Sequence, residues 1–396
     1  MKKVFALLLS CTLIMALMAG CNNNQTPPPA AGDEKVVRIG VFEPSSGDSG
    51  AGGKQETLGM QYANTLTPTV DINGETYKVV LEYADNASST DKAPTAAQQL
   101  VSKGVAVILG SYGSSVSMAG SPVFEQAGIP AIGVTCTNPQ VTQGNTHYFR
   151  ICFLDPFQGT VQAKFAAEKF SAKKAYCLAE LGNDYDVGLT TYFKQAFEAA
   201  GGTVVSETFP TGNADFTSYL TSAKNAGADV IFAPCSISYA TQIVEQAAAQ
   251  GITIPLMAGD TWDSNKVVEA AQGKEVQVFV STFYQEGGNP DFDKGFKEFI
   301  NSNPTNLANN GGNDMISAVS AMGYDAYYVA LEAMKAANSV EPQAINEALW
   351  NVEHTGVSGN IKFDAENGDA VRNTAYIKSV NTANNNWDFV KEQSID

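Results

Sequence analysis

Histidine and basic residues are scarce in this chain of 396 residues. The only histidines are His147 and His354, too few for a histidine-rich metal site. The chain has 24 Lys and Arg against 41 Asp and Glu, which gives a formal net charge of −17. Because nucleic-acid binding requires basic patches that neutralise phosphates, we expect no nucleic-acid partner.

Cysteines are few, and their spacing argues against the common cysteine sites. No C-x-x-C occurs, so a zinc site or a thioredoxin-like site is not expected. A nucleophilic Cys136 would need a base, and no spacing rule supports the nearest candidate, His147. The spacings also specify no disulfide pair among the cysteines beyond the N-terminal region, which are Cys136, Cys152, Cys177 and Cys235.

The sequence lacks the loops that hold phosphates and the turn that presents a nucleophilic serine. The Gly/Ser-rich stretch 43–53 matches neither G-x-x-x-x-G-K-[ST] nor G-x-G-x-x-G, and no G-x-S-x-G occurs. We therefore expect a binding protein and not an enzyme, with no cofactor and no metal.

What the chain does have at its start is an export pattern. The basic "MKK" precedes 15 apolar residues, "VFALLLSCTLIMALM", which suit a signal peptide better than a membrane span. The following "LMAGC" resembles the bacterial lipobox, in which the cysteine, here Cys21, is lipidated after cleavage. An ordinary secretory signal with a chance cysteine is the alternative. We expect a signal peptide at 1–20, a Pro-rich tether at 21–35, and a body anchored outside the cytoplasm through Cys21.

From residue 36 short apolar runs alternate with helical patterns. In the first series strands are expected at 36–42, 77–85, 105–110 and 129–135, with helices at 54–66, about 92–102 and about 115–126. In the second, strands are expected at 173–180, 202–209, 228–234 and 253–259, with helices at 186–200, 216–226 and 239–250. This alternation favours an α/β fold with two doubly wound parallel-sheet lobes.

Three stretches could carry the chain between the lobes, namely 147–159, which is expected to be a connecting strand, 276–282 and 355–364. The expected first lobe is 36–150 plus 283–356, and the expected second lobe is 151–282 plus 357–396. The polar stretch 301–314 is interpreted as a loop, and 319–337 as a core helix.

Ligands of open parallel sheets bind beyond the carboxyl ends of the strands, so the loops there hold the candidate residues. Ser114 and Ser115 stand where a helix is expected to begin, and its free N–H groups favour an anion such as a carboxylate. Thr137 follows the adjacent strand. The alternative for Ser114 is a simple helix cap.

In the second series the candidates are Tyr185 and Asp260. Asp260 lies between a strand and a helix, where it would either cap the helix or accept a ligand ammonium. Tyr185 would either cover a ligand or pack at the rim of the lobe.

Several segments taken in order resemble the leucine/isoleucine/valine-binding proteins, which are solute receptors of ABC importers with the type I periplasmic binding fold. They include "VVRIGVFEPSSGDSGAGGKQETLGMQYA", "VAVILGSYGSSVSMAGSPVFEQAGIPAIGVTCTNP", "GNDYDVG", "GYDAYYVALEAM" and "GNIKFDAENGD". The resemblance runs from about residue 37 to 392. It implies two lobes joined by three crossing strands that close on a ligand by hinge motion.

The resemblance also implies roles for residues. Ser114 and Thr137 would hold an α-carboxylate, while the backbone carbonyl of Thr135 and the Asp260 carboxylate would hold the ammonium. Tyr185 matches the family's tyrosine. The implied partners are an amino acid and an ABC permease in the membrane, and the body is expected to be monomeric.

The side-chain end of the pocket departs from the family. Gly52 stands where an aromatic residue is common, an aromatic of the second lobe falls near Ser236, and Tyr112 replaces an aliphatic residue. The branched-chain specificity is therefore left open. The alternatives are an amide, a small carboxylic acid or a peptide as ligand, or a role as an extracytoplasmic sensor domain.

Overall fold

A computed structural model describes residues 34–395 of the chain. The expected signal peptide, the lipidation site at Cys21 and nearly all of the tether lie outside these residues. Within the described residues, no helix combines the length and apolar character needed to cross a membrane.

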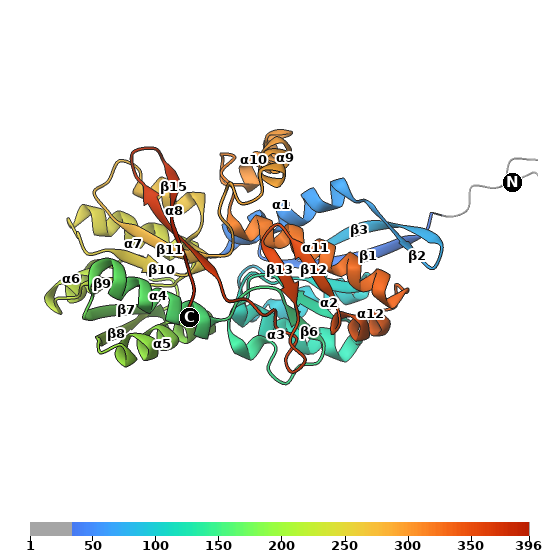
Figure 1. Cartoon of the computed structure of the whole chain (residues 1–396), viewed down its shortest axis with the longest axis horizontal. Coiled ribbons are helices and arrows are strands. Elements are labelled where there is room, and N and C mark those ends of the chain that lie inside the picture. Colours follow the sequence, from blue (N-terminus) through green and yellow to red (C-terminus); the bar gives the residue numbers. More distant parts are fainter. Residues whose placement is uncertain (1–33, 396) are drawn as a thin grey trace, which may run out of the picture. The chain divides into compact units, whose positions relative to one another are not determined.

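The first sheet contains six strands in the order β2-β3-β1-β4-β5-β6 (Figure 1). All neighbours pair in parallel except β2 and β3. The strands are β1 (Val36–Glu43), β2 (Thr69–Ile72), β3 (Glu75–Asp85), β4 (Val107–Leu109), β5 (Ala131–Gly133) and β6 (Tyr148–Arg150). The helices between them are α1 (Gly50–Leu66), α2 (Ala93–Ser102) and α3 (Ser114–Ala127), and a 3-10 turn, η1 (Pro139–Val141), precedes β6.

The second sheet contains seven strands in the order β15-β14-β11-β10-β9-β7-β8. Five are parallel, namely β7 (Lys174–Glu180), β8 (Thr203–Phe209), β9 (Val230–Phe232), β10 (Leu256–Ala258) and β11 (Val278–Thr282). The C-terminal pair β14 (Ala375–Asn381) and β15 (Asn386–Gln393) adds an antiparallel edge. The helical elements are α4 (Asp155–Phe170), α5 (Asp184–Ala199), α6 (Thr217–Asn225), α7 (Ile237–Ala249), η2 (Asp260–Trp262) and α8 (Asn265–Ala271).

The remaining elements follow β11. They are α9 (Pro290–Asn301), α10 (Pro304–Asn309), α11 (Ala318–Ala337), α12 (Pro342–Leu349) and the hairpin β12 (Glu353–Gly356) with β13 (Gly359–Lys362).

Helix α11 packs on α1 with almost no space between the backbones. A Cβ at Gly59 or Gly323 would collide with the carbonyl of Ser320 or Glu56, so only glycine permits this approach. The two parallel-sheet lobes of the α/β fold expected from the sequence are therefore present.

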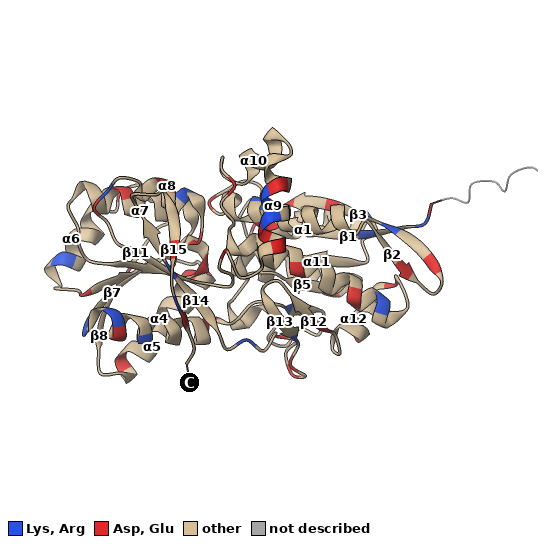
Figure 2. Cartoon of the chain, turned by 45° about the horizontal axis from the view of Figure 1, so that its top comes forward, with Lys and Arg blue, Asp and Glu red and all other residues tan. Residues whose placement is uncertain are grey.

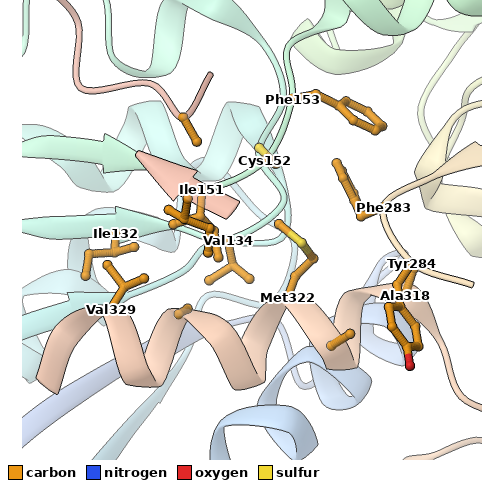
Figure 3. Packing of buried hydrophobic residues seen from close by; sticks show 14 of the residues in the cluster. Ile132, Val134, Ile151, Cys152, Phe153, Phe283, Tyr284, Ala318, Met322 and Val329 are labelled. Carbon is orange, nitrogen blue, oxygen red and sulfur yellow. The ribbon is translucent and has the colours of Figure 1, made fainter. Parts of the chain in front are cut away.

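The core runs through the junction between the two sheets. Met322 of α11 points from the helix towards Val134 and Ile151, in the same cluster of buried residues as Ile132 (Figure 3). Phe153 and Phe283 come from the first and second connections between the sheets, and their ring centroids are 4.2 Å apart. This apolar contact links two of the connecting segments directly.

The third connection is later in the chain than 355–364. Residues 353–362 form a hairpin, and the residues after it stay beside the first sheet, where the buried Arg150 pairs with Asp369 at 2.7 Å. The chain next enters the second sheet at β14, so we place the third passage at 371–374 and not where the second lobe was expected to resume, at residue 357.

Two further expectations from the sequence need correction. The stretch 147–159 is not one connecting strand, because β6 ends at Arg150 and α4 begins at Asp155. The expected polar loop 301–314 contains α10, whose N-terminal N–H at Asn306 is capped by the side chain of Asn303 at 2.8 Å.

Candidate functional site

A cavity of about 490 Å³ lies between the loops at the carboxyl ends of the two sheets. The first sheet contributes the loops that follow β1, β3, β4 and β5, and the second contributes those after β7, β8, β9 and β10. This is the position where open α/β sheets bind ligands. Five of the seven predicted ligand-binding residues line the cavity, namely Tyr112, Ser114, Thr135, Tyr185 and Ser236.

The first N–H groups of α3 form one part of the wall. Gly113, and not Ser114, is the N-cap residue, which removes the simple cap interpretation of Ser114. The Ser114 hydroxyl oxygen accepts from the backbone N–H of Asn138 at 3.2 Å, and the hydroxyl still has its own hydrogen to donate. Ser114 and the start of α3 therefore present hydrogen-bond donors, the arrangement that suits a carboxylate.

Thr137 lies behind this wall, since it is fully buried and does not line the cavity. Its backbone carbonyl accepts from the N–H of Asp155 at 3.0 Å, at the start of α4. Its hydroxyl lies beside the Asp155 carboxyl, which is also fully buried, and burial raises the pKa of Asp155 to about 8. The structure therefore places Thr137 at the junction with the second lobe, next to Asn138 and outside the cavity lining.

Two buried carboxyl groups lie behind Thr135 and Tyr112. The Thr135 hydroxyl donates to Glu56 at 3.1 Å, and the backbone N–H of Tyr112 donates to Glu43 at 2.7 Å. Burial raises the pKa of both glutamates well above their usual range, and the nearby Glu56 raises that of Glu43 further. A buried carboxyl pair without a cation retains protons, so it adds little charge to this wall.

The tyrosine side chain at position 112 occupies space that Gly52 leaves open. A Cβ at Gly52 would lie 2.5 Å from two ring carbons of Tyr112. The Tyr112 hydroxyl donates to the carbonyl of Thr261, in the opposite lobe, at 3.3 Å. The two departures noted in the sequence are therefore one packing arrangement, in which a large residue at 112 requires a small one at 52.

On the second-lobe side, Tyr185 covers Asp260. The Tyr185 hydroxyl donates to the Asp260 carboxylate at 3.0 Å, and the Gln158 amide donates to the same oxygen at 2.9 Å. Asp260 is only 1% exposed and does not line the cavity, and burial raises its pKa to about 6. The Asp260 carboxylate is therefore linked to the cavity indirectly, through the Tyr185 hydroxyl that donates to it.

Comparison with known proteins gives the same fold and family. The model of the periplasmic binding protein family matches residues 36–385. The chain belongs to the periplasmic binding protein family. It is 28% identical over 337 residues to Leu/Ile/Val-binding protein homolog 1 of Brucella abortus, covering 84% of this chain and 87% of that one.

Two solved structures resemble most of the chain. The leucine-binding protein LivK from Thermotoga maritima has 31% identity and a TM-score of 0.79, and the match covers 91% of this chain and 99% of that one. The branched-chain amino acid transporter substrate-binding protein LivJ from Streptococcus pneumoniae, in complex with isoleucine, has 26% identity and a TM-score of 0.77, with the same coverage.

In this periplasmic binding protein the two lobes touch across the cavity. The hydroxyls of Ser49 and Ser236 are 3.3 Å apart, and the Ser115 hydroxyl accepts from the N–H of Asp184 at 3.0 Å. Ser115 was considered from the sequence as a carboxylate contact, whereas here it also joins α3 to the start of α5. Loops of both lobes therefore enclose the cavity.

Sequence reasoning missed the acidic part of the lining. Glu180, which is 7% exposed, and the exposed Asp48 and Asp91 line the cavity. Acidic positions occur in both lobes (Figure 2). One signal was available, since Glu180 is the last residue of the strand expected at 173–180. The position of Asp48 opposite Glu180 depends on how the lobes meet, which no local pattern specifies.

Proposed function

We propose that this protein is a lipid-anchored receptor that binds an α-amino acid between its lobes and delivers it to an ABC permease. It would act without chemical conversion of the ligand and as a monomeric body. The names of its relatives support this assignment, since they include Leu/Ile/Val-binding proteins and a LivJ bound to isoleucine.

The observation that carries the proposal is the opposite chemistry of the cavity walls. The N-terminus of α3 with Ser114 offers donors for a carboxylate. The Thr135 backbone and the Tyr185–Asp260 pair offer a place for an ammonium group nearby. A zwitterion satisfies both walls at once, and desolvating it is favourable only when both of its charges are paired.

The test is calorimetric titration of residues 22–396 with the standard amino acids, prepared so that no copurified ligand remains. At least one α-amino acid should bind, while its N-acetyl and amide derivatives should bind at least about tenfold more weakly, because each loses one charged contact. Equal binding of benzoate or of an N-acetylated derivative would favour a small carboxylic acid as ligand and reject the proposal.

The anchor is tested separately in cells. The native chain should remain with the membrane fraction and incorporate a labelled fatty acid, whereas Cys21→Ala should do neither. Release of the native chain into the soluble fraction would favour an ordinary secretory signal.

A further inference from the structure

The cavity wall has no basic residue in a lining that includes three acids. None of the residues that line the cavity is Lys, Arg or His, whereas Asp48, Asp91 and Glu180 all line it. No ion pair within the described residues involves these three carboxylates. A ligand that enters the cavity therefore meets negative charge that the protein itself does not neutralise.

Glu180 and Asp48 approach each other from opposite lobes. The Tyr239 hydroxyl lies 3.2 Å from the Glu180 carboxylate and 3.4 Å from that of Asp48. A phenol has one hydrogen, so it can donate fully to only one of the two carboxylates. Ser238 also holds Asp48 from the second lobe, by a hydroxyl hydrogen bond of 2.9 Å.

The remaining hydrogen-bond partners of Glu180 are neutral or acidic. The Asn183 amide donates to its second oxygen at 3.1 Å, and the backbone N–H of Glu180 donates to the buried Asp186 at 2.9 Å. Asp48 and Glu180 therefore share one phenol at the contact between the lobes, where their carboxylates repel each other and a cation between them would relieve that repulsion. Because Glu180 is nearly buried, solvent screens this repulsion less than it would at an open surface.

We propose that the ligand is an α-amino acid whose side chain carries a second cation, an ammonium or guanidinium group, which is held between Glu180 and Asp48. This inference rests on the proposed function, since it assumes that the α-carboxylate and α-ammonium occupy the walls at Ser114 and Tyr185. The side-chain cation then contacts both lobes and favours their closure. The proposal differs from the specificity in the names of the relatives, whose ligands have apolar side chains.

The test compares matched ligands by calorimetry. Lysine and norleucine differ by the terminal ammonium, and arginine and citrulline are matched in shape but differ in charge. One cationic member should bind about ten- to a hundred-fold more tightly than its neutral partner, the range expected for a charge-assisted hydrogen bond. Glu180→Gln should remove most of that ratio, because it weakens binding of the cationic member and relieves the repulsion from Asp48 when the neutral partner is bound.

A matched control uses Glu198→Gln, an exposed acid of the same lobe on α5 outside the cavity lining, which should leave the ratio intact. Equal or tighter binding of norleucine and citrulline, or a ratio that Glu180→Gln does not change, would overturn the inference while leaving the amino-acid receptor in place. Binding of the diamine cadaverine as tightly as lysine would instead reject the α-amino acid proposal and support the cation site.

Discussion

The two walls of the cavity differ in the charge of the ligand group that each one suits. The first-lobe wall includes the start of α3, Ser114 and Thr135, and the exposed Asp48 and Asp91 lie on its other loops. Two further acids, Glu43 and Glu56, are buried behind this wall with raised pKa values. The second-lobe wall exposes Glu180 to the cavity and keeps Asp260 behind only a tyrosine hydroxyl. A bound molecule is therefore oriented by polarity, with its anionic group towards the start of α3 and its cationic groups towards Tyr185 and Glu180.

The largest expected effect comes from blocking the contact between the walls. Gly52→Trp should weaken ligand binding by at least about a hundredfold, because any side chain at this position collides with Tyr112 and displaces it from Thr261. Calorimetry on the folded variant measures this loss. Adding Tyr112→Leu should restore much of the affinity, and a double variant as weak as the single one would contradict the paired-size interpretation.

Ser114→Ala tests the donor wall. It removes a hydroxyl offered to the ligand carboxylate, so affinity should fall by about ten- to a hundred-fold. Titration with the best-binding amino acid gives the value. The matched control is Ser115→Ala, which removes the neighbouring hydroxyl that accepts from the Asp184 N–H and should have a smaller effect. A larger loss for Ser115→Ala than for Ser114→Ala would assign the carboxylate contact to Ser115.

Asp260, behind the second-lobe wall, should make ligand binding depend on pH. Burial raises the pKa of Asp260 to about 6, and a bound ammonium group would lower it again. Affinity should therefore be constant above about pH 6 and fall by up to about tenfold for each pH unit below it, as Asp260 takes up a proton.

The control for this pH dependence is Asp260→Asn. This variant should bind more weakly at pH 7 and lose the decline between pH 6 and 5, as measured by titration at each pH. A decline of unchanged size in the variant would assign the titration to another carboxyl group.

Thr137→Ala tests whether the carboxylate contacts extend from Ser114 to Thr137. The family resemblance assigns its hydroxyl to the carboxylate, whereas the structure places it beside Asp155 and off the cavity surface. We expect affinity to change by less than about threefold, within about 0.7 kcal/mol. A loss as large as that of Ser114→Ala would mean that Thr137 reaches the ligand after a rearrangement.

The smallest expected effect on binding is that of Asp155→Asn, which should alter stability instead. Burial raises the pKa of Asp155 to about 8 from an ordinary value of 3.8. Because the pKa of Asp155 is higher in the folded chain than in the unfolded chain, Asp155 contributes its full share of stability below about pH 4. This contribution to the free energy of unfolding is lost as the pH rises towards 8. Urea unfolding at pH 5 and pH 8 should show a smaller loss in Asp155→Asn than in the native chain, and an equal loss would place Asp155 in a more hydrated site.

The sequence predicted most strands and helices, because their patterns are local. It did not predict the helices in which buried side chains are polar. The helix α4 has no clear apolar stripe, since its Gln158 and Gln162 are fully buried and donate to Asp260 and the Ala258 carbonyl. The short α10 contains two asparagines, and the side-chain amide of its fully buried neighbour Asn310 donates to the carbonyl of Met315. A polar residue buried with partners from distant segments leaves no periodic signal in its own segment.

The sequence by itself determined the α/β class, the two lobes and the strand-end loops that hold the ligand candidates. It did so because hydrophobic periodicity and strand ends are properties of neighbouring residues. Only the tertiary structure decided that Thr137 and Asp260 stand behind the cavity wall, that Tyr112 occupies the space beside Gly52, and that Asp48 faces Glu180. Those outcomes depend on contacts between segments 60 or more residues apart or on opposite lobes, which local patterns do not encode.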